Sequence, residues 1–173
     1  DEEKKDVLFF VDNLFRFLQA GSELSTLLEE IPSEFGYQPT LQAEIAQFES
    51  RLMSTDQTQV TSVQTMYLPA DELNNPGVAA TLPHIDSIII LSRDIAQQGR
   101  FPTIDPLRSR SSSTDRSRIG DKHYKAITET IDILQRYEQL SRIVSIVGKE
   151  ELSVENQVIY DRGQKIINYM TQP

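Results

Sequence analysis

The chain has 173 residues, of which 38% are hydrophobic and 25% charged, and its formal net charge is -9. These totals predict a soluble globular protein of one domain or one and a half. Cysteine is absent, which excludes disulfides, zinc–thiolate sites and a cysteine nucleophile. The acidic balance disfavours non-specific nucleic-acid binding. His84 and His123 lie far apart, without metal-ligand spacing, so we expect them to be structural or surface residues.

Residues 7–11 form a continuous apolar run, VLFFV, which ends at Asp12. Such a run is typical of a strand buried on both faces of a parallel sheet. A carboxylate at its end would lie at the sheet edge where α/β proteins bind ligands. Asn13 and Arg16 follow within one helical turn and can converge on the same point. The pattern predicts the second half of a P-loop nucleotide site, with Asp12 holding Mg²⁺, usually through water. The alternative is a buried strand whose Asp12 caps the next helix.

The charged residues 1–6 lead directly into this strand, and no G-x-x-x-x-G-K-[ST] phosphate loop occurs in the chain. That loop is the other half of a P-loop site. A central strand also needs neighbours to pair with. We therefore expect the sequence to be a fragment, or the visible part of a longer subunit.

The pattern of apolar residues and breakers predicts the elements of the next 60 residues. In chain order these are a helix over 13–30, a loop with two prolines over 31–39, a helix over 41–53 and a strand over 59–68. Gly21 weakens the first helix by about 1 kcal/mol relative to Ala. Thr40 is a candidate cap for the second helix.

A turn-rich acidic loop over 69–76 leads to shorter elements. These are a helix over 78–84, a short buried strand over 87–91, a helix over 93–98 that Gly99 can close, and an extended segment over 101–106.

The segment 108–118 has four arginines, five serines and one acidic residue. Taken alone it could indicate an RNA-binding or phosphorylated tail. It lacks aromatic residues for base stacking, and an acidic chain is a poor electrostatic host for nucleic acid. We favour a mobile loop between domains.

From Lys122 onward, apolar residues recur every three or four positions up to Val147. This predicts a long amphipathic helix closed by Gly148. A short charged turn follows, and Ser153 can cap a final helix. A strand–helix region is thus followed by a helical hairpin, with the predicted boundary near residue 115.

Several segments, in this order, carry a family resemblance: DVLFFVDNLFRFLQAGSELSTLL, IPSEFGYQPTL, TSVQTMYLPADEL, LSRDIAQQGRFPTIDPL, IGDKHY and ELSVEN. The chain resembles the catalytic beta subunit of an F-type rotary ATP synthase over nearly its whole length. Type III export ATPases resemble it less, and the non-catalytic alpha subunit is closer but lacks the AGSE and GYQPTL forms. The resemblance implies the C-terminal half of a RecA-like P-loop nucleotide-binding domain at 1–115. It implies the α-helical hairpin of the C-terminal domain at 116–173, with an acidic lever turn at 149–156.

The resemblance also implies a catalytic site. Asp12 would be the Mg²⁺-associated aspartate, and Asn13 and Arg16 would face the terminal or free phosphate, where a guanidinium suits the developing charge. Tyr67 would lie near the phosphate end of the pocket. Phe101 would stack on adenine in place of a family tyrosine. Without the family, Arg16 is simply a surface arginine, Tyr67 a packed strand residue and Phe101 an apolar plug beside Pro102.

Three segments would face a central shaft: the bearing loop with Ile31 and Pro32, the loop with Glu72, Asn74 and Asn75, and the lever turn with Glu150, Glu151 and Leu152. The alternative for each is an ordinary solvated loop. Asn74 and Asn75 replace a Thr-Asp pair of the family, which removes a charge and suggests a diverged paralogue.

The implied function is ATP synthesis or hydrolysis by a proton-translocating rotary ATPase. Its cofactors would be Mg²⁺ and ATP or ADP, and its partners alpha subunits in an alternating hexamer and a gamma-type shaft. Nucleic acid is not an expected partner. The complex would lie on the cytoplasmic face of a bacterial membrane, or on the inner mitochondrial membrane, with only indirect membrane contact. Without a phosphate loop, this chain alone is not expected to turn over. The alternative is a diverged subunit of a specialised motor, for example for bacterial gliding, uncoupled from ion translocation.

Overall fold

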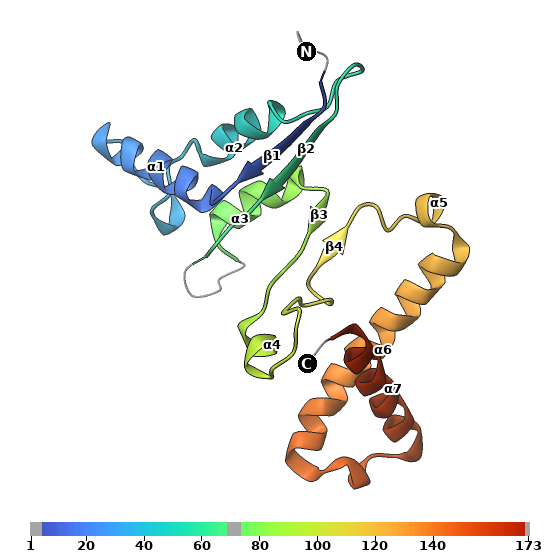
Figure 1. The fold of residues 1–173 in the computed structure, drawn as a ribbon. Helices are drawn as coiled ribbons and strands as arrows, with labels where there is room; N and C mark the ends of the chain where they lie inside the picture. Colours follow the sequence, from blue (N-terminus) through green and yellow to red (C-terminus); the bar gives the residue numbers. More distant parts are fainter. Residues whose placement is uncertain (1–4, 69–73, 172–173) are drawn as a thin grey trace. The chain divides into compact units, whose positions relative to one another are not determined.

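The computed structural model describes residues 5–68 and 74–171, without the side chain of Glu34. The chain divides into two compact units, Asp1–Ile85 and Asp86–Pro173. The first unit combines a pair of parallel strands with helices, and the second combines a short antiparallel pair with a long helical hairpin (Figure 1).

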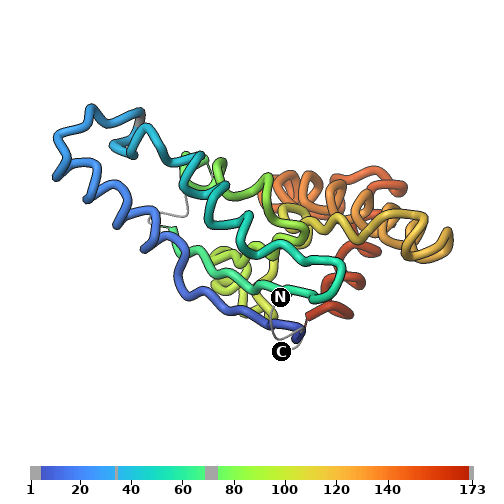
Figure 2. Tube along the Cα trace, turned by 90° about the horizontal axis from the view of Figure 1, so that it is seen from above, coloured from blue at the N-terminus to red at the C-terminus, as the bar shows by residue number. Residues whose placement is uncertain are grey.

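Two parallel strands form the sheet of the first unit, β1 (Val7–Val11) and β2 (Val60–Gln64). They run side by side in both views of the chain (Figures 1 and 2), with Val7 opposite Val60 and Val11 opposite Gln64. Parallel strands need a long crossover connection, which the helical segment between them supplies. The predicted strand at 7–11 and its parallel pairing are confirmed, and the strand at 59–68 is confirmed in a shorter form.

The prediction that β1 is buried on both faces is wrong for this structure. Leu8 is 60% exposed and Phe10 is 66% exposed, and Val7 on the other face is 47% exposed. In the part of the chain that the structure describes, β1 pairs with β2 alone. An apolar run shows that both faces of a strand favour burial, but the layers that cover it come from elsewhere in the fold.

The core of the first unit lies among three helices, α1 (Leu14–Leu27), α2 (Leu41–Ser50) and α3 (Pro76–Thr81). It is built from apolar residues of these helices and of the loop before α2: Leu18, Tyr37, Leu41, Ile45 and Ala80, with Phe15 and Met66 packed against them. Short 3₁₀ turns, η1 (Glu34–Gly36) and η3 (Leu82–His84), lie before α2 and after α3. The predicted helices exist, with bounds shifted by a few residues.

The hydrogen bonds at the start of α2 differ from those of the predicted Thr40 cap. Thr40 stands at the N-cap position but makes no side-chain cap hydrogen bond. Its hydroxyl instead donates to Glu44 Oε1 at 2.6 Å. A second donor, Gln38 Nε2, reaches the other oxygen of the same carboxylate at 2.7 Å. The side chain of Glu44 therefore ties the start of α2 to the loop before it.

The second unit begins with β3 (Ser87–Ile88), which pairs antiparallel with β4 (Arg110–Ser111), and with a bridge between Leu91 and Ile104. Between these lies α4 (Arg93–Gln97), followed by Gly99 at φ 69°, as predicted for a glycine that closes a helix. The predicted buried strand at 87–91 is wrong in length and burial, because Leu91 is 70% exposed.

The arginine- and serine-rich segment 108–118, for which we favoured a mobile loop between domains, includes regular secondary structure. It contains β4 and the single turn α5 (Arg116–Ile119). Ser112 N donates to Asp86 O at 2.8 Å, which holds the segment to the start of the unit. Asp115 caps α5 by accepting from Ser117 N at 2.7 Å and from the Ser117 hydroxyl. These hydrogen bonds lower the pKa of the Asp115 carboxyl.

The helical hairpin consists of α6 (Asp121–Val147) and α7 (Val154–Met170), which lie side by side (Figure 1). A 3₁₀ turn, η4 (Lys149–Glu151), connects them. Gly148 at φ 92° follows α6, and the Ser153 hydroxyl accepts from Asn156 N at the start of α7. Both helices and both end signals are confirmed. None of the described helices is long and apolar enough to span a membrane.

Close packing in the hairpin depends on a glycine in the middle of α7. Gly163 is buried, and a Cβ built on it would lie 2.5 Å from Tyr137 Cβ of α6. Nearby, the rings of Tyr137 and Tyr160 lie 5.0 Å apart. Burial next to Tyr137 raises the pKa of the Tyr160 hydroxyl. The two helices therefore meet at a point where no larger side chain fits.

We expect Gly163→Ala to destabilise the intact protein by about 1–3 kcal/mol, because the added methyl overpacks the contact with Tyr137. Helix propensity alone predicts the opposite sign, a gain of about 1 kcal/mol. Denaturant unfolding measures the difference. The control is Gln164→Ala at the exposed neighbouring position, which should change stability by less than about 0.5 kcal/mol. A stabilised Gly163→Ala variant would contradict the close contact.

Candidate functional site

Hydrogen bonds join the carboxyl ends of the two parallel strands. Thr65 N donates to Val11 O at 2.9 Å, and Thr65 O accepts from Leu14 N at 2.9 Å. The Thr65 hydroxyl donates to Asp12 Oδ1 at 2.7 Å. The first residue after β2 is therefore held against the residues that follow β1, on the edge of the sheet where ligands bind in α/β proteins.

Asn13 adds two hydrogen bonds to this junction between the carboxyl ends of β1 and β2. Its Oδ1 accepts from Phe15 N at 3.0 Å, which caps α1, and from Tyr67 N at 3.1 Å. The Asp12–Asn13 peptide bond is cis. The alternative in which Asp12 caps the helix is wrong, because Asn13 holds that position. Asp12 is left with an exposed carboxylate beside the helix N-terminus.

Arg16 and Tyr67 present exposed side chains near the same junction. Arg16 lies in the first turn of α1, and its guanidinium forms no ion pair with any residue that the structure describes. Tyr67 is 66% exposed. The structure thus holds Asp12 to Thr65 and Asn13 to Tyr67 through hydrogen bonds, and it places Arg16 three residues after Asn13 in the first turn of α1. An exposed guanidinium and a helix N-terminus both favour an anion.

The donor set at the junction fits Mg²⁺ held together with phosphate oxygens. Within residues 5–68 and 74–171, no three His, Asp or Glu side chains gather into a metal cage. Mg²⁺ at nucleotide sites needs no such cage, since one or two carboxylates, water and substrate phosphates hold it. Asp12 supplies one carboxylate, whose Oδ1 accepts from Thr65. Oδ2 has no hydrogen bond to a described residue and can face a metal-bound water.

Thr65 lies beside Asp12, although the pattern of the sequence did not single it out. The available signal was its position, since Thr65 immediately follows β2 as Asp12 immediately follows β1. Because parallel strands end at the same sheet edge, the first polar residue after each strand is a candidate neighbour of the other. This signal can be used only when the two strands are known to pair, and no local sequence pattern predicts that pairing.

Phe101 belongs to the second unit. It is 52% exposed, and its peptide bond to Pro102 is cis. The alternative of a fully packed plug beside Pro102 does not fit this exposure. Stacking of Phe101 on adenine stays a prediction.

The predicted bearing loop is exposed. Ile31 is 87% exposed, and Pro32 beside it is also exposed. The loop is closed by Ser33 N, which donates to Tyr37 O at 2.8 Å. The shape of the loop is therefore held by its own backbone, while its apolar residues face outward. Contact with a shaft stays a prediction.

The second predicted shaft-facing loop is only partly described, since Glu72 lies outside the described residues. Asn74 is exposed. Asn75 caps α3: its Oδ1 accepts from Gly77 N at 2.9 Å and from the Tyr37 hydroxyl at 2.7 Å. The oxygen of Asn75 is thus used inside the unit. A rotor contact by Asn74 or Asn75 stays a prediction.

The turn between the long helices separates acidic from apolar positions. Glu150 and Glu151 are exposed, whereas Leu152 is only 8% exposed. Lys149 Nζ lies 2.7 Å from Asp161 Oδ1 and anchors the turn to α7. This hydrogen bond raises the pKa of Lys149. A partner that touches this turn would meet Glu150 and Glu151 rather than Leu152.

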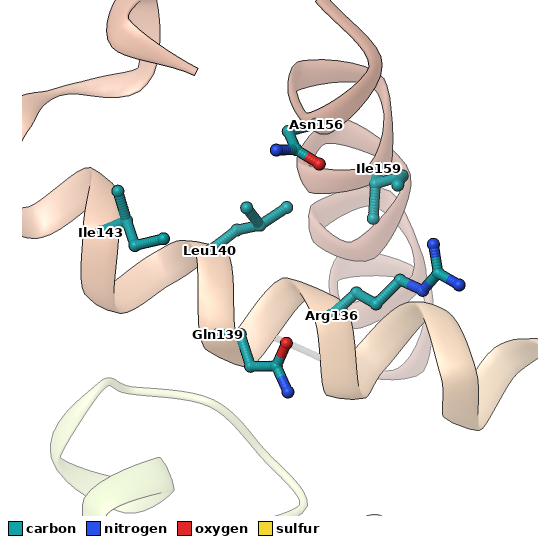
Figure 3. Close-up of a pocket in the computed structure, with 6 residues that line it drawn as sticks. All are labelled: Arg136, Gln139, Leu140, Ile143, Asn156 and Ile159. Atoms are coloured by element: carbon teal, nitrogen blue, oxygen red, sulfur yellow. The ribbon is translucent and has the colours of Figure 1, made fainter. Parts of the chain in front are cut away.

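An open groove of about 350 Å³ runs between the two long helices. Figure 3 shows the side chains that line it: Arg136, Gln139, Leu140, Ile143, Asn156 and Ile159. Arg136 pairs with Asp132 on its own helix at 3.3 Å. The groove brings together none of the predicted site residues, so it is not a candidate for the nucleotide site.

Comparisons with known proteins match two successive parts of the chain to two domain families. Residues 1–111 match the family model of the ATP synthase alpha/beta family, nucleotide-binding domain. Residues 112–173 match the C-terminal domain of V and A type ATP synthase. The chain is also similar to a solved structure described as a unique ATP synthase subunit, NeqB, from Nanoarcheaum equitans, with 25% sequence identity and a TM-score of 0.86. The similarity covers 99% of this chain but only 43% of that one.

Replacement of Asn13 by alanine should loosen the junction. We expect Asn13→Ala to cost about 1 kcal/mol, because α1 loses its cap, and to speed hydrogen exchange at the Phe15 and Tyr67 amides. Asn13→Asp keeps an acceptor oxygen and should change both rates less. Amide exchange in the intact protein, followed by NMR or mass spectrometry, measures the effect. Unchanged protection of Tyr67 in the alanine variant would show that its bond to Asn13 is unimportant.

Proposed function

The chain belongs to the ATP synthase alpha/beta family, and from this premise we propose that it is part of a catalytic, nucleotide-binding subunit of a rotary ATP synthase. The observation that supports the proposal is the exposed Asp12 carboxylate, oriented by Thr65 at the end of β1. In a nucleotide site this is the position from which a carboxylate holds Mg²⁺ against phosphates.

Four of the predicted site residues have distinct parts in this proposal. Asp12 would hold the water shell of Mg²⁺, which neutralises phosphate charge when it is bound. Asn13 would hold the backbone of Tyr67 against the start of α1, because its Oδ1 accepts from the Phe15 and Tyr67 amides. The Arg16 guanidinium would face the terminal phosphate, where charge develops during phosphoryl transfer. Phe101 would stack on the adenine ring with its apolar face.

The type of ATP synthase is part of the proposal. The motifs in residues 6–28 and 61–73 favour an F-type beta subunit, whereas the C-terminal segment matches the V and A type domain. We therefore place the proposed function at the level that both types share: coupling of nucleotide chemistry to rotation in a membrane-associated complex. Partners at this level are neighbouring nucleotide-binding subunits in a hexamer and a central shaft. The specialised-motor alternative is not favoured, because both family models describe ATP synthase domains.

The chain spans 43% of the length of the NeqB structure, so the activity of a whole subunit is itself proposed. Turnover requires a phosphate loop, which this sequence does not contain. Experiments on the function therefore call for the intact protein in its complex.

Asp12→Asn tests the proposed metal role. Because it removes the charge that faces Mg²⁺, we expect the Mg²⁺ concentration for half-maximal ADP binding to rise on the order of tenfold or more. Calorimetry or a fluorescent ADP derivative measures the binding of the nucleotide to the intact protein.

Asp6→Asn is the matched control, with the same change of charge at the other end of β1. Asp6 Oδ1 accepts from Gln59 N at 2.9 Å, and asparagine keeps that acceptor. This variant should leave the Mg²⁺ dependence unchanged. An Asp12→Asn variant that binds ADP with the parent's Mg²⁺ dependence would refute the assignment of Asp12.

A further inference from the structure

The hydroxyl of Thr65 has a single proton and two acceptors within reach. Asp12 Oδ1 lies at 2.7 Å and Val11 O at 3.4 Å. The shorter distance falls in the range of a good O–H···O bond, and the longer one does not. Donation to an ionised carboxylate is also stronger than donation to a neutral carbonyl. The Thr65 hydroxyl therefore donates its hydrogen bond to Asp12 Oδ1 rather than to Val11 O.

The backbone of Thr65 fixes where this hydroxyl points. Its N–H is bound to Val11 O, and its carbonyl oxygen accepts from Leu14 N, each at 2.9 Å. Thr65 is thus held on one side by the end of β1 and on the other by the start of α1. A β-branched side chain adds stiffness, because its χ1 angle has few allowed values. The donor is in place before any ligand arrives.

The hydrogen bond between Thr65 and Asp12 contributes little to the stability of the fold. Thr65 and Asp12 are both exposed, so water could satisfy each of them at almost no cost. Its main consequence is geometric, because engaging Oδ1 fixes the plane of the carboxylate. Oδ2 has no partner in the described part of the chain and is the oxygen left to face a ligand.

We propose that Thr65 is a positioning residue for the metal-facing carboxylate of Asp12. This inference rests on the proposed function and deepens it. Thr65 holds Oδ1, so Oδ2 alone meets the water shell of Mg²⁺. Magnesium requires near-ideal octahedral geometry and tolerates misplaced ligands poorly. A residue that orients a metal ligand in this way typically contributes 10–100-fold in metal affinity.

Three substitutions in the intact protein separate this role from general support of the fold. Thr65→Val keeps the shape of the side chain and removes the donor, and Thr65→Ser keeps the donor and removes the methyl. Thr61→Val makes the same chemical change on β2, the strand that Thr65 follows, at an exposed position opposite Leu8. The probe is a fluorescent ADP derivative, titrated with Mg²⁺ and, separately, bound in excess EDTA.

For Thr65→Val we expect the half-maximal Mg²⁺ concentration to rise on the order of tenfold, with ADP binding in EDTA unchanged. Thr65→Ser and Thr61→Val should follow the parent. Weaker ADP binding in EDTA for Thr65→Val would indicate a structural role only and overturn the inference. So would a Thr65→Val variant that follows the parent, or a Thr65→Ser variant as impaired as Thr65→Val.

The same titration separates the two proposals. A parent protein that binds ADP with no dependence on Mg²⁺ would overturn the proposed function, and the role of Thr65 with it. A parent that shows the dependence, together with an unaffected Thr65→Val variant, would overturn only the role of Thr65.

Discussion

The hydrogen bonds between the carboxyl ends of β1 and β2 are the constraint on which the candidate site depends. Through backbone and side chain, Thr65 contacts the last residue of β1, the carboxylate after it and the first residue of α1. Asn13 adds a second link to Tyr67. Residues more than 50 positions apart are thereby kept within hydrogen-bonding distance, and the carboxylate of Asp12 is aimed without being buried.

Exposure and order are combined at this site. Asp12 and Arg16 are exposed, yet backbone hydrogen bonds of Thr65 to Val11 and Leu14 hold the chain on either side of Asp12. The core that supports them lies behind α1, where Leu14 and Leu18 are almost completely buried. Rigid support under exposed polar groups lowers the entropic cost of ordering them when a ligand binds. The hairpin shows the same arrangement, with Leu152 buried under the exposed Glu150 and Glu151.

Much of the fold could be predicted because the signals are local. Ser153 before an apolar repeat, and Gly99 and Gly148 after others, mark helix ends through hydrogen bonds made within a few residues. Burial was predicted less well. The apolar residues at 7–11 and 87–91 suggested buried strands, but Phe10 and Leu91 are exposed, since burial depends on other layers. A loop was favoured for the segment 108–118, because residues 86–88, to which it is hydrogen-bonded, are remote in sequence.

The sequence by itself determined the class of the fold, the helices to within a few residues at their ends, and the placement of Asp12, Asn13 and Arg16 after a strand. Apolar periodicity and helix-end signals involve residues within a single turn or strand, so they can be recognised from the sequence alone. Only the tertiary structure decided that β1 pairs with β2 in a register that ends both strands together. It alone showed that Thr65 therefore meets Asp12, and that Gly163 allows α7 to touch Tyr137. These contacts join distant segments, and long-range packing rather than local preference chooses them.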